Sequence, residues 1–256
     1  MDYHLAIPSH RRAKMLGDKT LKYLQLSNAP KPTIYVSDDQ DLTEYRNLYP
    51  HLTVVLAPKG IAATRNFIQD TQPLNTKIVF IDDDIEEVYH LDVSAVKPTK
   101  YKIRDFNALV QEGFDCAKKA GTTWWGTYPT DHTLCLKPYI RRNLCYVNGS
   151  LFGVLNSRVS VKEDHGEDFE RSLRYWQKEG KLCRLEFIGL LTKYYKNAGG
   201  LQETRNEIMT NESIYRIQEE FPSLCKVRRK KGKWADLSFK RFPVDPIPLR
   251  GEGGSV

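Results

Sequence analysis

The first half of the chain alternates short apolar runs with segments whose apolar residues recur at helical spacing. Apolar runs of four or five residues, without alternating polar positions, are typical of strands covered on both faces. Four such strands are predicted at residues 3–8, 33–39, 52–58 and 77–84, with helices between them at 16–24, 41–48 and 60–69. This order predicts an α/β fold with a mostly parallel central sheet and helices on both faces.

The second half is less regular, which predicts a mixed continuation of the sheet. Apolar spacing predicts a helix from Phe106 to Ala117 and another from Phe169 to Trp176 that ends at Gly180. Strand-like segments occur at 122–129, 146–157 and 182–187. Because no repeat and no long linker interrupts the chain, we expect one domain over residues 1–256, with a C-terminal segment at 206–250.

The predicted strand ends carry the unusual residues of the first half. In a parallel sheet, ligands bind at the carboxyl ends of the strands. Pro8, Ser9, Asp38, Asp39 and the run 82–84 all fall at such ends.

The run Ile81–Asp84 is the sharpest of these features. Three adjacent carboxylates repel one another unless a cation lies among them. Mg²⁺ or Mn²⁺ prefers oxygen ligands and keeps positions open for phosphate oxygens. In an extended segment, Asp82 and Asp84 would face one ligand and Asp83 would face elsewhere. A solvated acidic turn is the alternative, and the position at a strand end favours the metal.

No glycine-rich phosphate loop of either common kind, GxxxxGK[ST] or GxGxxG, occurs in the chain. A bound nucleotide would therefore depend on a metal and on isolated cations. Arg11, Arg12 and Arg65 are the candidates, although a single arginine is more often a surface residue.

The segment Glu163–Glu170 (EDHGEDFE) holds five acids just before a predicted helix. Acids at a helix N-terminus commonly cap it. The functional alternative is a general base, Asp168 or Glu167, which takes the proton of an attacking hydroxyl. His165 could serve as a base or a metal ligand, but a lone histidine is usually neither.

Two further groups are candidates for an acceptor cleft. Core packing is the favoured interpretation of Trp124 and Trp125. Because adjacent residues on a strand point to opposite faces, at least one of them could line a cleft. Asn148 and Gly149 could present polar groups and bare backbone to the same cleft.

The net charge of +7 is concentrated near the C-terminus. Residues 226–241 hold eight basic residues and one acid, which leaves 31 basic and 31 acidic residues in the rest of the chain. A basic run with interleaved aromatic residues can contact a nucleic-acid backbone, although it can also be a solvated loop. The residues expected at a phosphate backbone are Arg228, Arg229, Lys230, Lys231 and Lys233.

Other classes of protein are disfavoured. No apolar run approaches the ~20 residues of a membrane helix, and the first residues lack the pattern of a signal peptide. Five scattered cysteines without a CxxC pair fit a reducing cytoplasm. Nothing in the sequence indicates an obligate protein partner.

Taken together and in this order, HLAIPSHRR, YVSDD, GIAATRN, FIDDD and HGEDFE resemble the motifs of GT-A glycosyltransferases over residues 3–176. The resemblance implies a UDP-sugar donor, Mn²⁺ or Mg²⁺ held by Asp84 with Asp82, and Asp168 as the base of an inverting reaction. It assigns residues 1–90 to the donor and 91–205 to the acceptor. The residues it implies at the nucleotide-sugar are Pro8, Ser9, Arg11, Asp38, Asp39, Arg65, Asp82 and Asp83. Those expected at the acceptor are Trp124, Trp125, Asn148, Gly149 and His165.

The segment KYYKNAGGLQ and the basic stretch after it are similar to the glycosyltransferases associated with TET/JBP oxygenases, including the base J type. That resemblance implies transfer to a 5-hydroxymethyl pyrimidine in DNA. Many members occur in phages, and a phage-encoded chain would act in the host cytoplasm. A GT-A enzyme acting on protein or carbohydrate, and a nucleic-acid-binding module without catalysis, are the alternatives.

Overall fold

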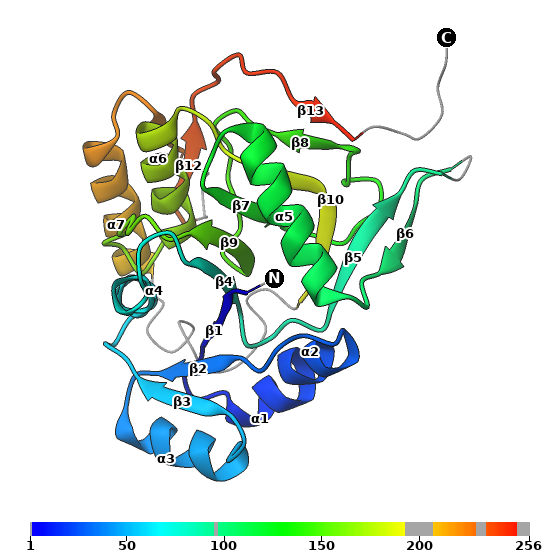
Figure 1. Ribbon diagram of the computed structural model, residues 1–256. Helices are drawn as coiled ribbons and strands as arrows, with labels where there is room; N and C mark the ends of the chain where they lie inside the picture. Colours follow the sequence, from blue (N-terminus) through cyan, green and yellow to red (C-terminus); the bar gives the residue numbers. More distant parts are fainter. Residues whose placement is uncertain (1, 95–96, 193–206, 229–233, 250–256) are drawn as a thin grey trace.

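A computed structural model describes residues 2–94, 97–192, 207–228 and 234–249 of the chain (Figure 1). One large mixed sheet runs through it. In spatial order its strands are β3 (Thr53–Leu56), β2 (Thr33–Val36), β1 (His4–Pro8), β4 (Lys77–Ile81), β9 (Leu151–Leu155), β7 (Trp124–Tyr128), β10 (Arg184–Leu191), β8 (Tyr139–Arg141) and β13 (Ile247–Pro248). The strands β5 (Glu87–Asp92) and β6 (Thr99–Lys102) form a hairpin that joins the sheet through β10.

The two halves of the sheet differ in strand direction. β3, β2, β1 and β4 are mutually parallel, as the β-α order predicted. β9 then pairs antiparallel with both β4 and β7, while β7 and β10 are parallel. The predicted α/β class, with a parallel first half and a mixed second half, is therefore confirmed.

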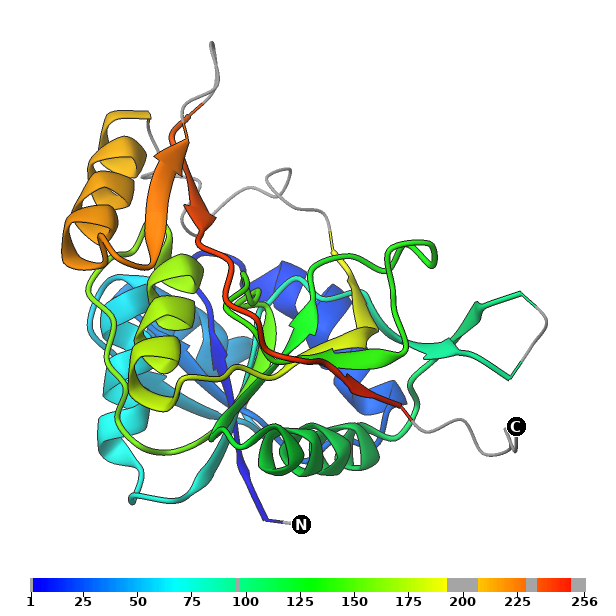
Figure 2. The same ribbon diagram turned by 90° about the horizontal axis from the view of Figure 1, so that it is seen from above.

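Helices cover both faces of the sheet (Figures 1 and 2). One face carries a nearly continuous helical segment made of α1 (Ala13–Leu16), the π-helical turn η1 (Gly17–Leu21) and α2 (Lys22–Leu26), together with α3 (Asp39–Leu48) and α5 (Phe106–Ala120). The other face carries α4 (Ile61–Thr71), α6 (Glu167–Glu179) and α7 (Glu207–Glu220). The observed helices match those predicted before residue 180 to within a few residues. α6 ends at Gly180, which adopts the left-handed conformation with φ 67° that glycine tolerates best.

The paired tryptophans belong to the core. Trp125 packs into the cluster under α5, and Trp124 stacks on Tyr175 of α6 with ring centroids 4.7 Å apart. They do point to opposite faces, but β7 lies in the middle of the sheet and each face there is covered by a helix. Both side chains are 0% exposed. The expectation that one of them lines an acceptor cleft is therefore wrong.

The chain after residue 206 adds elements that the apolar pattern did not predict. α7 packs beside α6, and β11 (Cys225–Arg228) pairs antiparallel with β12 (Asp236–Phe239) in a hairpin that lies against α7 (Figure 2). Cys225 and Leu237 face inward, whereas Lys226 and Arg228 are exposed. Arg229, Lys230, Lys231 and Lys233 lie outside the described residues, as does the segment 193–206. No helix in the described part of the chain is long and apolar enough to cross a membrane.

Candidate active site

A cavity of about 760 Å³ lies where the parallel strands end. One side of it is lined by Pro8 and Ser9 at the end of β1, by Tyr35 and Ser37 at β2, and by residues 82–84 after β4. The opposite side is formed by Tyr146 and residues 148–150, by the segment 162–169 that leads into α6, and by three residues of α7. The predicted donor and acceptor motifs thus meet around one space, although they lie far apart in the sequence.

The three aspartates after β4 have different partners. Asp82 accepts a hydrogen bond from Arg65 Nη2 at 2.9 Å. Asp83 pairs with Arg12 at 3.0 Å and accepts the Ser9 hydroxyl at 2.6 Å, and Asp84 lies 3.8 Å from the same arginine. Because β4 ends at Ile81, the alternation expected of an extended segment does not continue through these residues, and Arg12 lies between Asp83 and Asp84.

Solvent access separates these carboxylates further. The side chain of Asp83 is 6% exposed, and that of Asp82 is 33% exposed. Burial and the neighbouring acids Asp84 and Asp83 raise the pKa of Asp82 to about 7, against the lowering effect of Arg65. Burial also raises the pKa of Asp83, although Arg12 and Ser9 oppose it. Carboxylates under this mutual repulsion gain from a divalent cation, and the oxygen donors suit Mg²⁺ or Mn²⁺. Asp82 and Asp84, which line the cavity, fit that role.

Arg65 connects the two sides of the cavity. Its guanidinium, on α4, donates a hydrogen bond to Asp82 after β4 at 2.9 Å. On the other side of the cavity it donates to Glu167 and to the Gly149 carbonyl, each at 2.7 Å. A Cβ at position 149 would overlap Arg65 and Asp168, which explains the glycine there. Arg65 was expected to contact the nucleotide-sugar. It does line the cavity, and it also forms ion pairs with Asp82 and Glu167.

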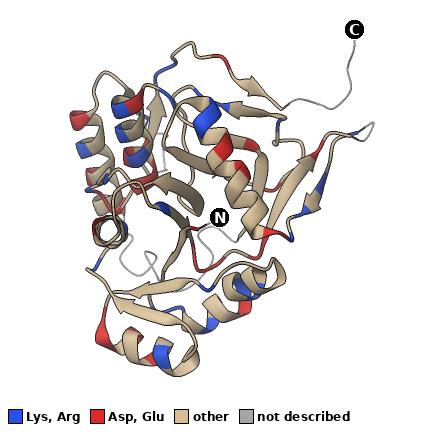
Figure 3. Ribbon diagram, in the orientation of Figure 1, with Lys and Arg blue, Asp and Glu red and all other residues tan. Residues whose placement is uncertain are grey.

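Each of the five acids of segment 163–170 has its own set of partners. Figure 3 shows acidic and basic residues interleaved along α6 and α7. Glu163 forms a bidentate pair with Arg216 of α7, with both contacts at 2.8 Å. Asp164 accepts the amide N–H of Ala62 at 2.9 Å and so caps α4. Glu170 accepts the amide N–H groups of residues 162 and 163. These three carboxylates organise the loop around the cavity.

Glu167 is held between two buried arginines. It accepts Arg65 at 2.7 Å and pairs with Arg171, one turn later on α6. Both guanidiniums also lie over the ring of Phe152, on β9. Burial alone would raise the pKa of Glu167, but the positive charges of Arg171 and Arg65 outweigh it and lower that pKa. A carboxylate stabilised in its ionised form in this way is a weak proton acceptor, which favours Asp168 over Glu167 of the two candidate bases.

Asp168 also lines the cavity, and its hydrogen-bond partner there is the side-chain hydroxyl of Tyr146. The Asp168 side chain is 27% exposed, and its Oδ2 accepts the Tyr146 hydroxyl at 2.7 Å. Arg65 stays 3.8 Å from Oδ1. Burial and the negative charge of Glu167 raise the pKa of Asp168 to about 8. A raised pKa makes the ionised carboxylate a stronger base, and the ionised form prevails above that pH. Nothing in the sequence marked Tyr146, because its role depends on where the loop before β9 folds.

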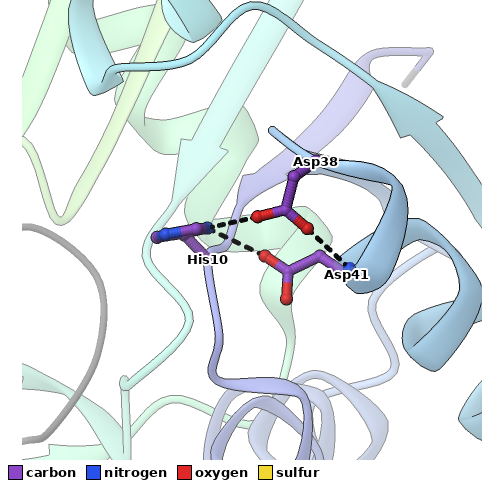
Figure 4. Close-up of side chains that lie close together, drawn as sticks. All are labelled: His10, Asp38 and Asp41. Carbon is purple, nitrogen blue, oxygen red and sulfur yellow. Dashed lines mark hydrogen bonds and ion pairs between the residues drawn. The ribbon is translucent and has the colours of Figure 1, made fainter.

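A second cluster lies at the ends of β1 and β2 (Figure 4). His10 Nδ1 lies 2.9 Å from Asp41 Oδ2 and 3.7 Å from Asp38 Oδ2, and the ligand atoms of the three residues are within 4.8 Å of one another. Each carboxylate also has a structural partner: Asp38 caps α3 by accepting the Asp41 N–H, and Asp41 accepts the N–H of Arg11. The cluster therefore ties the loop after β1 to the start of α3.

Several predicted donor residues lie beside the cavity rather than on it. Arg11 is exposed, with φ 52°, and Arg12 is the arginine of this pair that lines the cavity. Asp39 is exposed in the first turn of α3, and Asp38 faces His10, which does line the cavity. Asp39 is therefore not among the lining residues, whereas Ser37 after β2 and His10 after β1 are.

Of the predicted acceptor residues, Asn148, Gly149 and His165 line the cavity. The Asn148 side chain accepts the N–H of Ser150 at 2.7 Å, which shapes the turn before β9. His165 is buried at the same wall.

Comparison with known proteins identifies this arrangement. Residues 3–200 match the sequence model of the family described as TET-Associated Glycosyltransferase. No curated protein sequence matches the chain.

Similar solved structures include those of glucosyl-3-phosphoglycerate synthase from Mycobacterium tuberculosis. The complex with phosphoglyceric acid has a TM-score of 0.53, and the complex with Mn²⁺, UDP and phosphoglyceric acid has 0.51; each shows 11% identity over 96% of this chain and 89% of that one. The UDP complex has a TM-score of 0.52 at 11% identity, over 96% and 90%. At this identity the similarity shows a GT-A-like fold.

Proposed function

The chain belongs to the TET-associated glycosyltransferase family, and on that premise we propose that it transfers a sugar from a UDP-sugar to the hydroxyl of a 5-hydroxymethyl pyrimidine in DNA. The observation that carries this proposal is the position of Asp168. It faces the acid cluster of β4 across one cavity, its pKa is raised, and Tyr146 orients it.

The donor is proposed to bind on the β1, β2 and β4 side. Asp84 and Asp82 would hold Mn²⁺ or Mg²⁺, which supplies positive charge to offset the charge that grows on the leaving diphosphate. The carboxylate donors support this assignment, as does the Mn²⁺–UDP complex of the structurally similar synthase. Arg12, which neutralises Asp83, keeps that carboxylate from competing for the same cation.

The chemistry is proposed to be a single displacement. Asp168 accepts the proton of the acceptor hydroxyl while the oxygen attacks the anomeric carbon from the face opposite the diphosphate. The C–O bond to the diphosphate breaks, and the product has the inverted configuration. A hydroxyl is a poor nucleophile at neutral pH, so a positioned base contributes about 10²–10⁴-fold.

DNA as the acceptor is supported by charge. The net charge of +7 resides in the segment that contains the β11–β12 hairpin, and Lys226 and Arg228 are exposed on that hairpin. Phosphate contacts of this kind supply affinity without sequence selection. A base inside a duplex must leave the stack to reach a cavity, at roughly a few kcal/mol, so mismatched or single-stranded targets should react faster.

A mass-spectrometric screen tests the proposal. The protein is incubated with Mn²⁺, one of several UDP-sugars and an oligonucleotide that contains 5-hydroxymethylcytosine. We expect a mass increase of one sugar residue that disappears with EDTA and with an unmodified cytosine control. Transfer to a carbohydrate or protein acceptor, with none to the oligonucleotide, would contradict the proposed acceptor.

Replacing Asp84 with alanine tests the metal site. We expect the variant to lose Mn²⁺-dependent UDP binding in calorimetry while it keeps its far-UV circular dichroism. Equal UDP affinity with and without metal in the wild type would contradict a metal-held donor.

A further inference from the structure

Three aromatic rings form a row from the candidate base to the basic hairpin. Tyr146 and Phe169 have ring centroids 4.8 Å apart, and Phe169 meets Phe239 of β12 edge-on at 5.7 Å. The hydroxyl at one end of the row is bonded to Asp168, and the strand at the other end pairs with β11, which carries Lys226 and Arg228. The row thus extends from the candidate base, Asp168, to the exposed basic residues of the hairpin.

Tyr146 and Phe169 both line the cavity, whereas Phe239 supports Phe169 from the side of the hairpin. Phe169 is half-buried, so part of its ring remains accessible. The rest of this wall is mostly polar, with Asn148, Ser213 and Arg216, and Met209 of α7 is its other apolar side chain. An apolar ring beside the base is therefore a local feature of the acceptor side. Flat aromatic surfaces bind nucleobases by stacking, with little dependence on which base is present.

We infer that Phe169 is the surface on which the planar ring of the acceptor base stacks, with Tyr146 setting the distance from that ring to Asp168. The inference rests on the proposed function and adds the acceptor subsite to it. The hydroxymethyl group of the stacked base then lies toward Asp168, and the DNA backbone leaves along the hairpin toward Lys226 and Arg228. Phe169 and Tyr146 take the role that the sequence had suggested for Trp124 or Trp125.

The alternative is that Phe169 only packs. Its ring does contact the apolar cluster on the α6 face. A packing role would affect stability and all ligands alike, whereas a stacking role is specific for the presence of a base.

The test measures binding of two fluorescent oligonucleotides by anisotropy, with UDP and Mn²⁺ present. One contains a single 5-hydroxymethylcytosine, and the other has an abasic site at that position. For the wild type we expect the base to improve affinity by about 5- to 150-fold over the abasic site, which corresponds to about 1–3 kcal/mol per stacked base. In Phe169→Leu that ratio should fall toward one, and Phe169→Trp should restore it.

Phe242→Leu is the matched control. Phe242 is half-buried and packs on Trp176 of α6, the helix that also carries Phe169. It is not among the residues that line the cavity. Its variant should keep the wild-type ratio. UDP affinity, measured for each variant, reports whether the donor side is intact.

The outcomes separate the two ideas. If the wild type glycosylates the modified base and Phe169→Leu keeps the wild-type ratio, the stacking inference alone is wrong. If Phe169→Leu lowers affinity for both oligonucleotides and for UDP equally, the residue is structural and the inference is also wrong. If the wild type hydrolyses UDP-sugar but glycosylates no base, the proposed acceptor fails, and the subsite fails with it.

Discussion

The two acid-rich segments of this protein face each other across one cavity, yet they use their charges differently. In segment 163–170, most of the carboxylates have close partners within hydrogen-bond distance: Arg216, the N-terminus of α4, a pair of arginines and a set of loop amides. In segment 82–84, Arg12 and Arg65 pair with three carboxylates, and Arg65 is shared with Glu167 across the cavity.

The difference shows what decides the role of an acid. Where partners are supplied, the carboxylates build the structure, and Asp168, which has the Tyr146 hydroxyl as its closest partner, is the proposed base. Where positive charge is shared, as at Asp82 and Asp84, the repulsion favours a bound cation. Four predictions test this contrast, and the largest effect comes first.

Replacing Asp168 with asparagine keeps the shape and removes the proton acceptor. We expect turnover to fall by about 10²–10⁴-fold while UDP affinity stays near the wild-type value. Steady-state transfer and calorimetry measure the two quantities. Near-normal turnover in this variant would move the base to another residue.

Replacing Glu167 with alanine leaves Arg65 and Arg171 buried without their shared carboxylate. We expect a loss of about 3–5 kcal/mol in the free energy of unfolding, because an unpaired buried charge is strongly destabilising. Urea denaturation measures it. Glu163→Ala breaks the more exposed pair with Arg216 and should cost only about 0–1 kcal/mol. Equal losses in both variants would contradict the distinction between the two pairs.

Acid should inactivate the enzyme through Asp168. Because its pKa is raised to about 8, the group is mostly protonated below that pH and cannot accept a proton. The deprotonated fraction, and with it kcat/KM, should rise about tenfold per pH unit and level off above pH ~8. In Tyr146→Phe the lost hydrogen bond, which favours the ionised form, should shift the profile toward higher pH. A profile that is flat between pH 6 and 9 would exclude this titration.

The smallest effect concerns the basic stretch. Neutral replacements of Arg228, Arg229, Lys230 and Lys231 should reduce the slope of log affinity against log salt for duplex DNA by about 0.9 per lost phosphate contact. An unchanged slope would remove this segment from the DNA-binding surface. The activity toward a free hydroxymethylated nucleoside serves as the control and should not change.

Much of the fold was predictable because local pattern and global topology agree. The parallel strands β1 to β4 are short apolar runs between clear turns, and their ends collect the cavity residues. The direction of β9 was not predictable, because an apolar run does not encode which neighbour it pairs with. α7 was not predicted either, because most of its residues are polar and only a few, such as Ile214 and Ile217, are apolar and buried.

The motifs that form the site could be predicted from the sequence, but the separate roles of the residues within each motif could not. Glu167 and Asp168 are adjacent acids of the same kind, and only the approach of Arg65 and Arg171 separates them. Trp124 and Trp125 were correctly placed on opposite faces of a strand, yet sequence does not tell how deeply a strand lies within its sheet. Tyr146 carries no local signal, because it acts through a residue 22 positions away.

Arg65 has a consequence beyond holding the cavity together. Its guanidinium contacts Asp82 on the proposed donor side and lies near Asp168 on the other side. A change of charge at Asp82 should therefore change the pKa of Asp168. If the proposed donor complex binds at Asp82, its cation would offset the charge of that carboxylate, leave Arg65 less neutralised, and so lower the pKa of Asp168. By thermodynamic reciprocity, loss of the Asp168 proton must tighten donor binding by the same factor. Donor binding should therefore release protons, and the base becomes competent when there is a sugar to transfer.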